Sequence, residues 1–129
     1  MTTTSRPSER KKRTSELTKA VIDLCTAYGG YAWRNANQPR IDPKTRKAFF
    51  PDKRSIGSPD VIAAMPGGVT LWIEIKVTPD KLRESQGKFA IEMRMRGHLY
   101  AVVKDNTDNL VKWLREPRFT ITEAAKGEE

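Results

Sequence analysis

The sequence predicts an α/β domain in which helices flank a mixed β-sheet. Residues 17–28 repeat apolar side chains every three or four positions, which is the period of a helix. Residues 69–77 instead alternate apolar and polar side chains, as a β-strand does. The predicted order of elements along the 129 residues is helix, three strands, helix, strand and helix.

The first helix is expected over residues 17–28, with Thr14 or Ser15 as its N-terminal cap. Gly29-Gly30 follows directly, and glycine tolerates the left-handed conformation that lies just beyond many helix ends. A short strand is then expected over residues 31–35.

Residues 36–57 form a long connection that is rich in Pro, Lys, Arg and Asn and shows no sustained period. Within it, residues 41–50 are expected to fold as a ribbon around a turn at residues 43–46. Connections of this length are usually functional or disordered.

Two strands are expected over residues 60–65 and 69–77, joined by Pro66-Gly67-Gly68. If these three residues form the whole loop, the antiparallel register places Asp60 directly opposite Glu74. A two-residue loop would turn Asp60 to the other face of the sheet, unless a β-bulge restored it.

A second helix is expected to begin near Thr78, a capping residue that is followed by Pro79 and Asp80. Gly97 is expected to end this helix, and residues 98–103 read as a buried strand. The last helix is expected to have its cap at Asn106 or Thr107 and its apolar side at Leu110, Val111, Trp113 and Leu114.

The composition predicts one soluble, basic domain, with 24 Lys and Arg against 16 Asp and Glu. No stretch approaches the roughly 20 apolar residues that a membrane helix needs, and the N-terminus lacks the apolar run of a signal peptide. An intracellular protein without a membrane partner is therefore expected. A single cysteine, Cys25, and a single histidine, His98, exclude an internal disulfide and a thiolate zinc site, so any metal must be held by oxygen ligands.

Basic residues are concentrated in two segments. Residues 1–13 are expected to form a disordered basic arm, and residues 34–54 contain the second excess. The folded domain is expected over residues 14–116, followed by a frayed tail at residues 117–129. Such segments favour a polyanion, most often nucleic acid, although solvated charge that aids solubility is the alternative.

Glu74 and Lys76 lie two residues apart on one strand and therefore share a face. Opposed carboxylates at Asp60 and Glu74 would repel each other, so a cation is expected between them. Mg²⁺ suits two carboxylates, a backbone carbonyl and water. The alternative is an ordinary solvated strand face, which the surrounding apolar run makes less suitable.

Gln86 interrupts the apolar side of the second helix. A buried amide needs hydrogen-bond partners, and the polar group at Glu74 and Lys76 is one candidate. The alternative is a purely structural hydrogen bond to a strand end. The apolar side comprises Leu82, Phe89, Ala90 and Met93 around this glutamine.

The ordered set of Asp, Glu-x-Lys and Gln resembles the virus-type replication-repair nuclease (VRR-NUC) family of the PD-(D/E)XK nuclease superfamily. The resemblance covers residues 15–115, and residues 36–57 are the part that departs from it. The segments that carry it are Gly57-Ser58-Pro59-Asp60, Trp72-Ile73-Glu74-Ile75-Lys76, Ser85-Gln86, Gly97-His98-Leu99-Tyr100-Ala101-Val102-Val103 and, upstream, Tyr31-Ala32-Trp33-Arg34-Asn35.

The resemblance implies a restriction-endonuclease-like fold and metal-dependent hydrolysis of DNA. Asp60, Glu74 and the carbonyl of Ile75 would bind Mg²⁺, for which Mn²⁺ is expected to substitute. Lys76 would orient or help deprotonate the attacking water, or stabilise the transition state. Gln86 would fix Lys76 or a metal-bound water.

The resemblance also implies a glutamate in the first helix, for which Glu16 is the candidate. Complementing the positive end of that helix is the other interpretation of Glu16. Arg34 is a candidate contact for the phosphate of the cleaved strand, or simply an exposed strand arginine. The other DNA-binding candidates are Lys11, Lys12, Arg13, Lys44, Arg46, Lys47, Lys53 and Arg54.

Stand-alone members of this family resemble viral or bacterial Holliday-junction resolvases. The expected function is therefore a structure-specific endonuclease in DNA recombination and repair, in the cytoplasm of a bacterium or of a phage-infected cell. A resolvase cuts two opposed strands and one chain offers one site, so a homodimer acting on branched DNA is expected. The alternatives are a less selective endonuclease or nickase for duplex or flap DNA, and a non-catalytic DNA-binding module.

Overall fold

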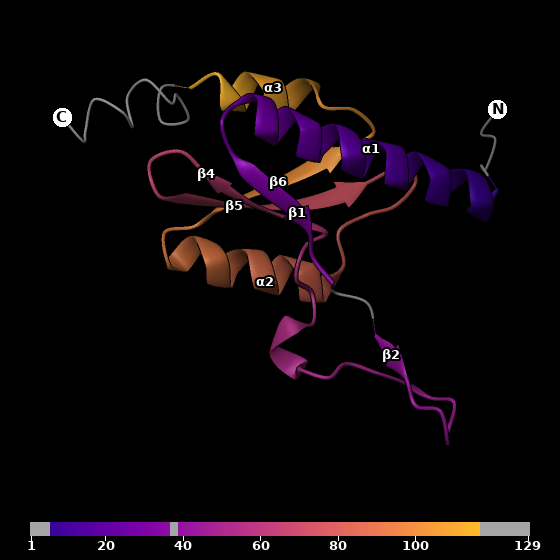
Figure 1. The fold of residues 1–129 in the computed structure, drawn as a ribbon. Helices are drawn as coiled ribbons and strands as arrows, with labels where there is room; N and C mark the ends of the chain where they lie inside the picture. The colour runs from indigo at the N-terminus through magenta and orange to yellow at the C-terminus, as the bar shows by residue number, and fades with distance from the viewer. Residues whose placement is uncertain (1–5, 37–38, 117–129) are drawn as a thin grey trace.

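A computed structural model describes residues 6–36 and 39–116 of the chain (Figure 1). The predicted tail at residues 117–129 and the first five residues of the predicted arm lie outside the described residues.

Four strands form the main sheet, in the order β1 (Tyr31–Arg34), β4 (Val61–Met65), β5 (Val69–Lys76) and β6 (Leu99–Lys104). The pairs β1–β4 and β4–β5 are antiparallel, whereas β5 and β6 are parallel. The predicted mixed sheet is therefore confirmed. A parallel pair needs a crossover connection, and the helix between β5 and β6 provides it.

Three helices cover the sheet from two sides. α1 (Pro7–Ala27) and α3 (Asp108–Leu114) lie over one face, and α2 (Glu84–Met95) lies over the other (Figure 1). None of the described helices is long and apolar enough to cross a membrane. Between α1, α3 and the sheet lies the main core, whose fully buried members include Val21, Val61, Leu71, Ile73 and Leu114.

The first helix begins at Pro7, so the prediction of a disordered arm is wrong for residues 7–13. The physical reason is that Glu, Lys and Arg are good helix formers and that proline suits the first turn, where its missing N–H costs nothing. Thr14 is not the cap, because its hydroxyl donates a hydrogen bond to the carbonyl of Arg10 within the helix. The predicted end of the helix at Gly29-Gly30 is confirmed.

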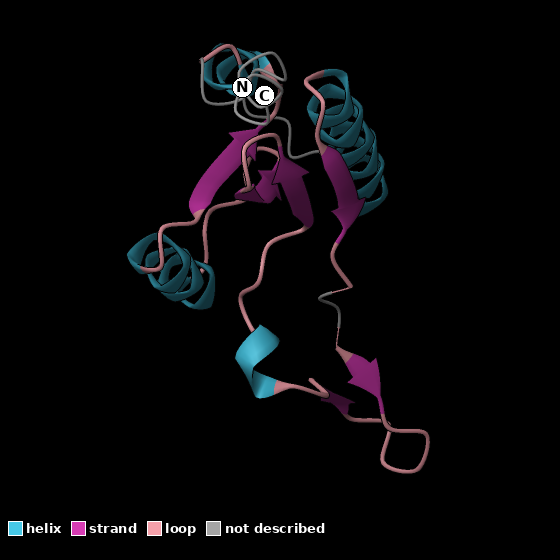
Figure 2. Cartoon of the chain, turned by 60° about the vertical axis from the view of Figure 1, so that its left-hand side comes forward, coloured by secondary structure: helices cyan, strands magenta, loops and turns pink. Residues whose placement is uncertain are grey.

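The long connection folds as a small ribbon, as predicted. β2 (Arg40–Ile41) pairs with β3 (Ala48–Phe49), and the short 3-10 helix η1 (Lys53–Ser55) follows. The ribbon lies apart from the main sheet and its helices (Figure 2). Its basic side chains are exposed to solvent.

The N-terminal cap of the second helix is Arg83, five residues later than the predicted cap Thr78, and the helix begins at Glu84. Thr78 does not cap it, because both its N–H and its hydroxyl donate hydrogen bonds to the carboxylate of Asp105, just beyond β6. This tertiary contact overrides the local capping signal. The end of the helix just before Gly97 is as predicted, and a strand follows it. This strand, β6, lies at the edge of the sheet, and only Tyr100 and Val103 are buried in it, so the prediction of a buried strand is wrong for the rest of it.

Thr107 is the N-terminal cap residue of α3, as one of the two alternatives predicted, but its side chain makes no capping hydrogen bond. The N–H of Asp108 donates instead to the side-chain oxygen of Asn106. Both residues therefore take part in starting the helix.

Asp105 ties the end of β6 to the end of β5, and it does so with a positive φ of 65°. Replacing Asp105 with Ala should lower the free energy of unfolding by about 1–2 kcal/mol, since the hydrogen bonds are lost and the left-handed backbone remains. Asp105→Gly loses the same hydrogen bonds, but glycine adopts a positive φ without strain. Its free energy of unfolding should therefore be about 1 kcal/mol higher than that of Asp105→Ala. Urea unfolding of both variants measures the difference, and equal losses would contradict this account.

Candidate active site

The β4–β5 hairpin brings two carboxylates to one end of the sheet. Val61 pairs with Ile73 and Met65 with Val69, which is the register predicted from a three-residue loop. Asp60 precedes Val61 and so lies level with Glu74. The carboxylate of Asp60 accepts a hydrogen bond of 2.9 Å from the N–H of Ile75.

Glu74 and Lys76 lie on the same face of β5 and are both buried, with 2% and 8% of their surface exposed. The ammonium of Lys76 is 3.6 Å from Oε1 of Glu74. The same oxygen accepts a hydrogen bond of 3.0 Å from Nε2 of Gln86. Burying a charged pair is costly, so its presence at the end of the core points to a chemical role.

These residues line a single hollow of about 280 Å³. β5 and the residues just before β4 contribute one wall, and the start of α2 contributes another. The five predicted members that meet there are Asp60, Glu74, Ile75, Lys76 and Gln86.

One oxygen of the site lacks a partner. Oε2 of Glu74 is buried and accepts no hydrogen bond from the described residues. Burial and, next, the nearby charge of Asp60 raise the pKa of Glu74, Lys76 opposes both effects, and the net pKa is about 8. A carboxylate with these surroundings gains most from an added cation.

The donor set fits a hard divalent cation. N–H and C=O of one strand residue point the same way, so the carbonyl of Ile75 faces Asp60 together with its N–H. Asp60, Glu74 and this carbonyl supply the oxygen ligands that Mg²⁺ and Mn²⁺ prefer. Among the described residues, no group of three or more His, Cys, Asp or Glu side chains lies close enough to hold an ion.

No protein-family model and no curated protein matches the sequence. A solved structure described as a "VRR_NUC domain" does match the fold, with a TM-score of 0.53 and 21% sequence identity. The match covers 79% of this chain and 92% of that one. The chain has the fold of a VRR_NUC domain.

Gln86 has two structural tasks in this VRR_NUC fold. Its side-chain oxygen accepts a hydrogen bond from the N–H of Arg83 at the start of α2, and its amide group holds Glu74. The partner in the site is thus Glu74, one of the two residues predicted from the sequence, whereas the resemblance implied Lys76 or a metal-bound water. The structural hydrogen bond goes to the start of α2 and not to a strand end, which was the predicted alternative.

Glu16 does not reach the hollow that holds Glu74. It is exposed and lines a different hollow, with Arg13, Val77 and Asp105. The side chain of α1 that does line the acidic hollow is Thr14, two residues earlier. Residues two apart on a helix point to different sides, so both cannot face the site. The structure therefore places Glu16 outside the group it was predicted to join.

The predicted DNA-binding residues fall into separate places. Lys11 and Arg34 line a hollow next to Asp60, whereas Lys12 is exposed on α1. Of the other predicted residues, Arg13 lies on α1 and lines the hollow of Glu16. The rest lie exposed on the ribbon and η1, namely Lys44, Arg46, Lys47, Lys53 and Arg54.

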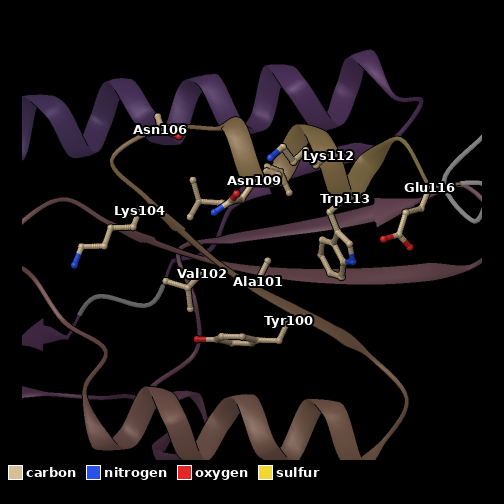
Figure 3. Close-up of a pocket in the computed structure, with 11 residues that line it drawn as sticks. Tyr100, Ala101, Val102, Lys104, Asn106, Asn109, Lys112, Trp113 and Glu116 are labelled. Carbon is tan, nitrogen blue, oxygen red and sulfur yellow. The ribbon is translucent and has the colours of Figure 1, made fainter.

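Another hollow, of about 530 Å³, lies between β6 and α3 (Figure 3). Tyr100, Lys104 and Trp113 are among its lining residues, and Glu116 is its single carboxylate. It does not contain the paired carboxylates that metal-dependent hydrolysis needs.

Asn35 is the residue that sequence reasoning did not single out as part of the site. Its side-chain amide donates to the hydroxyl of Ser58 (2.9 Å) and to the carbonyl of Pro59 (3.0 Å). Its backbone N–H donates to the carbonyl of Asp60 at 2.8 Å. Two of these hydrogen bonds thus fix the backbone that presents the Asp60 carboxylate, and the third holds the side chain of Ser58. An asparagine at the end of a strand is the signal that was available.

Gly57 lets the segment before Asp60 pass close to the start of α2. Its φ is +83°, and a Cβ placed there would lie 2.2 Å from the carbonyl oxygen of Ser85. Gly68 in the hairpin loop is a matched control, with φ +76° and no atom within 4 Å of a Cβ.

Gly68→Ala should cost about 1 kcal/mol, the price of a left-handed alanine. Gly57→Ala should cost a further 1–3 kcal/mol or so, because a backbone atom of α2 must also move. Thermal or urea unfolding of the two variants measures this difference. Equal destabilisation would show that Gly57 does not hold the segment against α2.

Proposed function

We propose that the chain is a VRR-NUC nuclease, a metal-dependent endonuclease that hydrolyses phosphodiester bonds of DNA. The observation that carries the proposal is the meeting of Asp60, Glu74 and Lys76 in one hollow at the end of the β4–β5 hairpin. The VRR_NUC fold, the matching order of these residues and the net positive charge of the chain support it.

In the reaction, a water oxygen forms a bond to phosphorus and the bond from phosphorus to one deoxyribose oxygen breaks. The water gives up a proton, and the leaving oxygen takes one up. A divalent cation, when bound by Asp60, Glu74 and the Ile75 carbonyl, supplies Lewis acidity for the water and the phosphate.

Lys76 is placed to act on the reacting groups directly. Its ammonium shares the hollow with both carboxylates and is almost completely shielded from solvent. A charge in such a place acts strongly on the developing negative charge of the phosphate, and it also orients the water. Gln86 is a positioning residue, since its amide holds Oε1 of Glu74 and so sets the direction of the other oxygen.

We further propose branched DNA as the substrate and a homodimer as the active form. The described part of one chain provides one such hollow, and cutting two opposed strands of a junction requires two. The exposed ribbon carries basic side chains away from the hollow, which suits contacts with the backbone of a neighbouring arm. A non-catalytic DNA-binding module fits less well, because binding alone does not require a buried Glu74–Lys76 pair.

Replacing Asp60 with Asn should abolish cleavage while DNA binding persists, with a loss on the order of 10² to 10³ or more in rate. Both proteins are incubated with end-labelled four-way junction, flap and linear duplex, in Mg²⁺, Mn²⁺ or EDTA. Asp23→Asn, an exposed carboxylate of α1 outside the hollow, is the control and should cut as the wild type does.

Paired nicks across the junction, present with metal and absent from Asp60→Asn, are the expected result. Equal cutting of all three substrates would retain the nuclease and contradict the preference for branched DNA. Binding without any cutting would contradict the nuclease itself.

A further inference from the structure

A second hollow, of about 530 Å³, opens between α1 and β1 beside the acidic one. Arg10 and Lys11 line it from α1, and Arg34 lines it from the end of β1. The two carboxylates in its lining are those of Asp60 and Asp80. Because residues 7–13 are helical, the two cations of α1 have fixed positions relative to the sheet.

The three cations are available to a ligand. Within residues 6–36 and 39–116, no salt bridge involves Arg10, Lys11 or Arg34. In the same part of the chain, the guanidinium of Arg34 makes only two long hydrogen bonds, of 3.4 and 3.5 Å, to the carbonyl and the hydroxyl of Ser15. These contacts keep Arg34 beside α1 and leave most of its N–H donors for an anion.

Two of the three hydroxyls of this wall already donate hydrogen bonds. The hydroxyl of Thr14 donates to the carbonyl of Arg10, and that of Thr18 donates to the carbonyl of Thr14. Besides the hydroxyl of Ser15, the donors that remain for a ligand are the cationic groups, and guanidinium and ammonium groups are the usual partners of phosphate.

The basic and acidic hollows adjoin each other. Thr14, Asp60 and Asp80 line both of them. A polyanion that presents one phosphate to the Asp60 and Glu74 carboxylates, with their metal, extends directly past Thr14 to the three cations. Along this surface, the carboxylates that would bind the metal are followed by the three cations. This arrangement matches a chain of phosphates better than it matches a small anion.

We propose that the α1–β1 hollow binds a backbone phosphate next to the scissile one, on the same DNA strand. The proposal rests on the proposed function for the identity of the ligand as DNA. It assigns Arg10, Lys11 and Arg34 to this phosphate, and it distinguishes them from the ribbon cations, which lie apart from the sheet.

The first test compares two double variants that remove the same charge. Arg10→Gln/Lys11→Gln removes two of the three cations that line the hollow. Lys19→Gln/Lys88→Gln removes two exposed helical lysines, which pair only with carboxylates of their own helices among the described residues. Unfolding midpoints establish that both variants fold. Binding to a labelled four-way junction is then measured by anisotropy in EDTA across a salt series.

The hollow variant should bind about tenfold more weakly at 100 mM salt, and the slope of log K against log salt should fall by about 1, as expected for one lost phosphate contact. The control variant should bind less than about twofold more weakly, because it loses only long-range attraction. Equal losses in the two variants would overturn the proposal.

A second measurement identifies the phosphate. Single neutral methylphosphonates are placed in turn along the strand on both sides of the branch point. One position should weaken binding by the wild type and have a much smaller effect on Arg10→Gln/Lys11→Gln, which keeps only Arg34 of the three cations. The absence of such a position would also overturn the proposal.

The outcomes separate the two proposals because binding in EDTA needs no cleavage. If Arg10→Gln/Lys11→Gln loses more binding than the control but the wild type never cuts in Mg²⁺ or Mn²⁺, the proposed function is contradicted and the phosphate site stands. If the wild type cuts DNA but the two double variants lose the same amount of binding, the proposed function stands and the phosphate site is contradicted. A protein that does not bind DNA loses both.

Discussion

The register of the β4–β5 hairpin determines what the rest of the molecule can do. The three-residue loop sets Val61 opposite Ile73, and Asp60 therefore lies level with Glu74. Side chains alternate along strands, so a shift of one residue would place Asp60 on the other face of the sheet. The same pairing turns Ile73 into the core beneath α1 and α3 and leaves Glu74 at the α2 side. The strand pairing that forms the core therefore also positions the two carboxylates of the site.

Other contacts reinforce that register where the strands end. Asn35 clamps the backbone around Asp60 from β1, Gly57 allows a close approach to α2, and Gln86 holds Glu74 from the other side. A buried carboxylate oxygen still lacks a partner after all of these contacts are made. The fold therefore stabilises an arrangement whose charges are not balanced by the described protein groups alone, which is typical of a site that takes up a cation.

The parts that depend on local rules could be predicted from the sequence. The hairpin register follows from Pro66-Gly67-Gly68, and the pairing of Asp60 with Glu74 follows from that register. The start of α2 could not be predicted, because Thr78 binds Asp105, which is 27 residues away. The prediction for Glu16 was wrong for a related reason. The side of a long helix that faces the site depends on how the helix packs on the sheet, and that side carries Thr14.

Metal binding tests the central claim most directly, because it precedes any DNA substrate. Titration calorimetry with Mn²⁺ should show binding by the wild type and by Asp23→Asn, with affinity at least about tenfold lower for Asp60→Asn, which removes a ligand while keeping the shape of the side chain. Equal Mn²⁺ affinity for wild type and Asp60→Asn, or no binding by either, would contradict the assignment of the hollow at Asp60 and Glu74 as a metal-dependent active site.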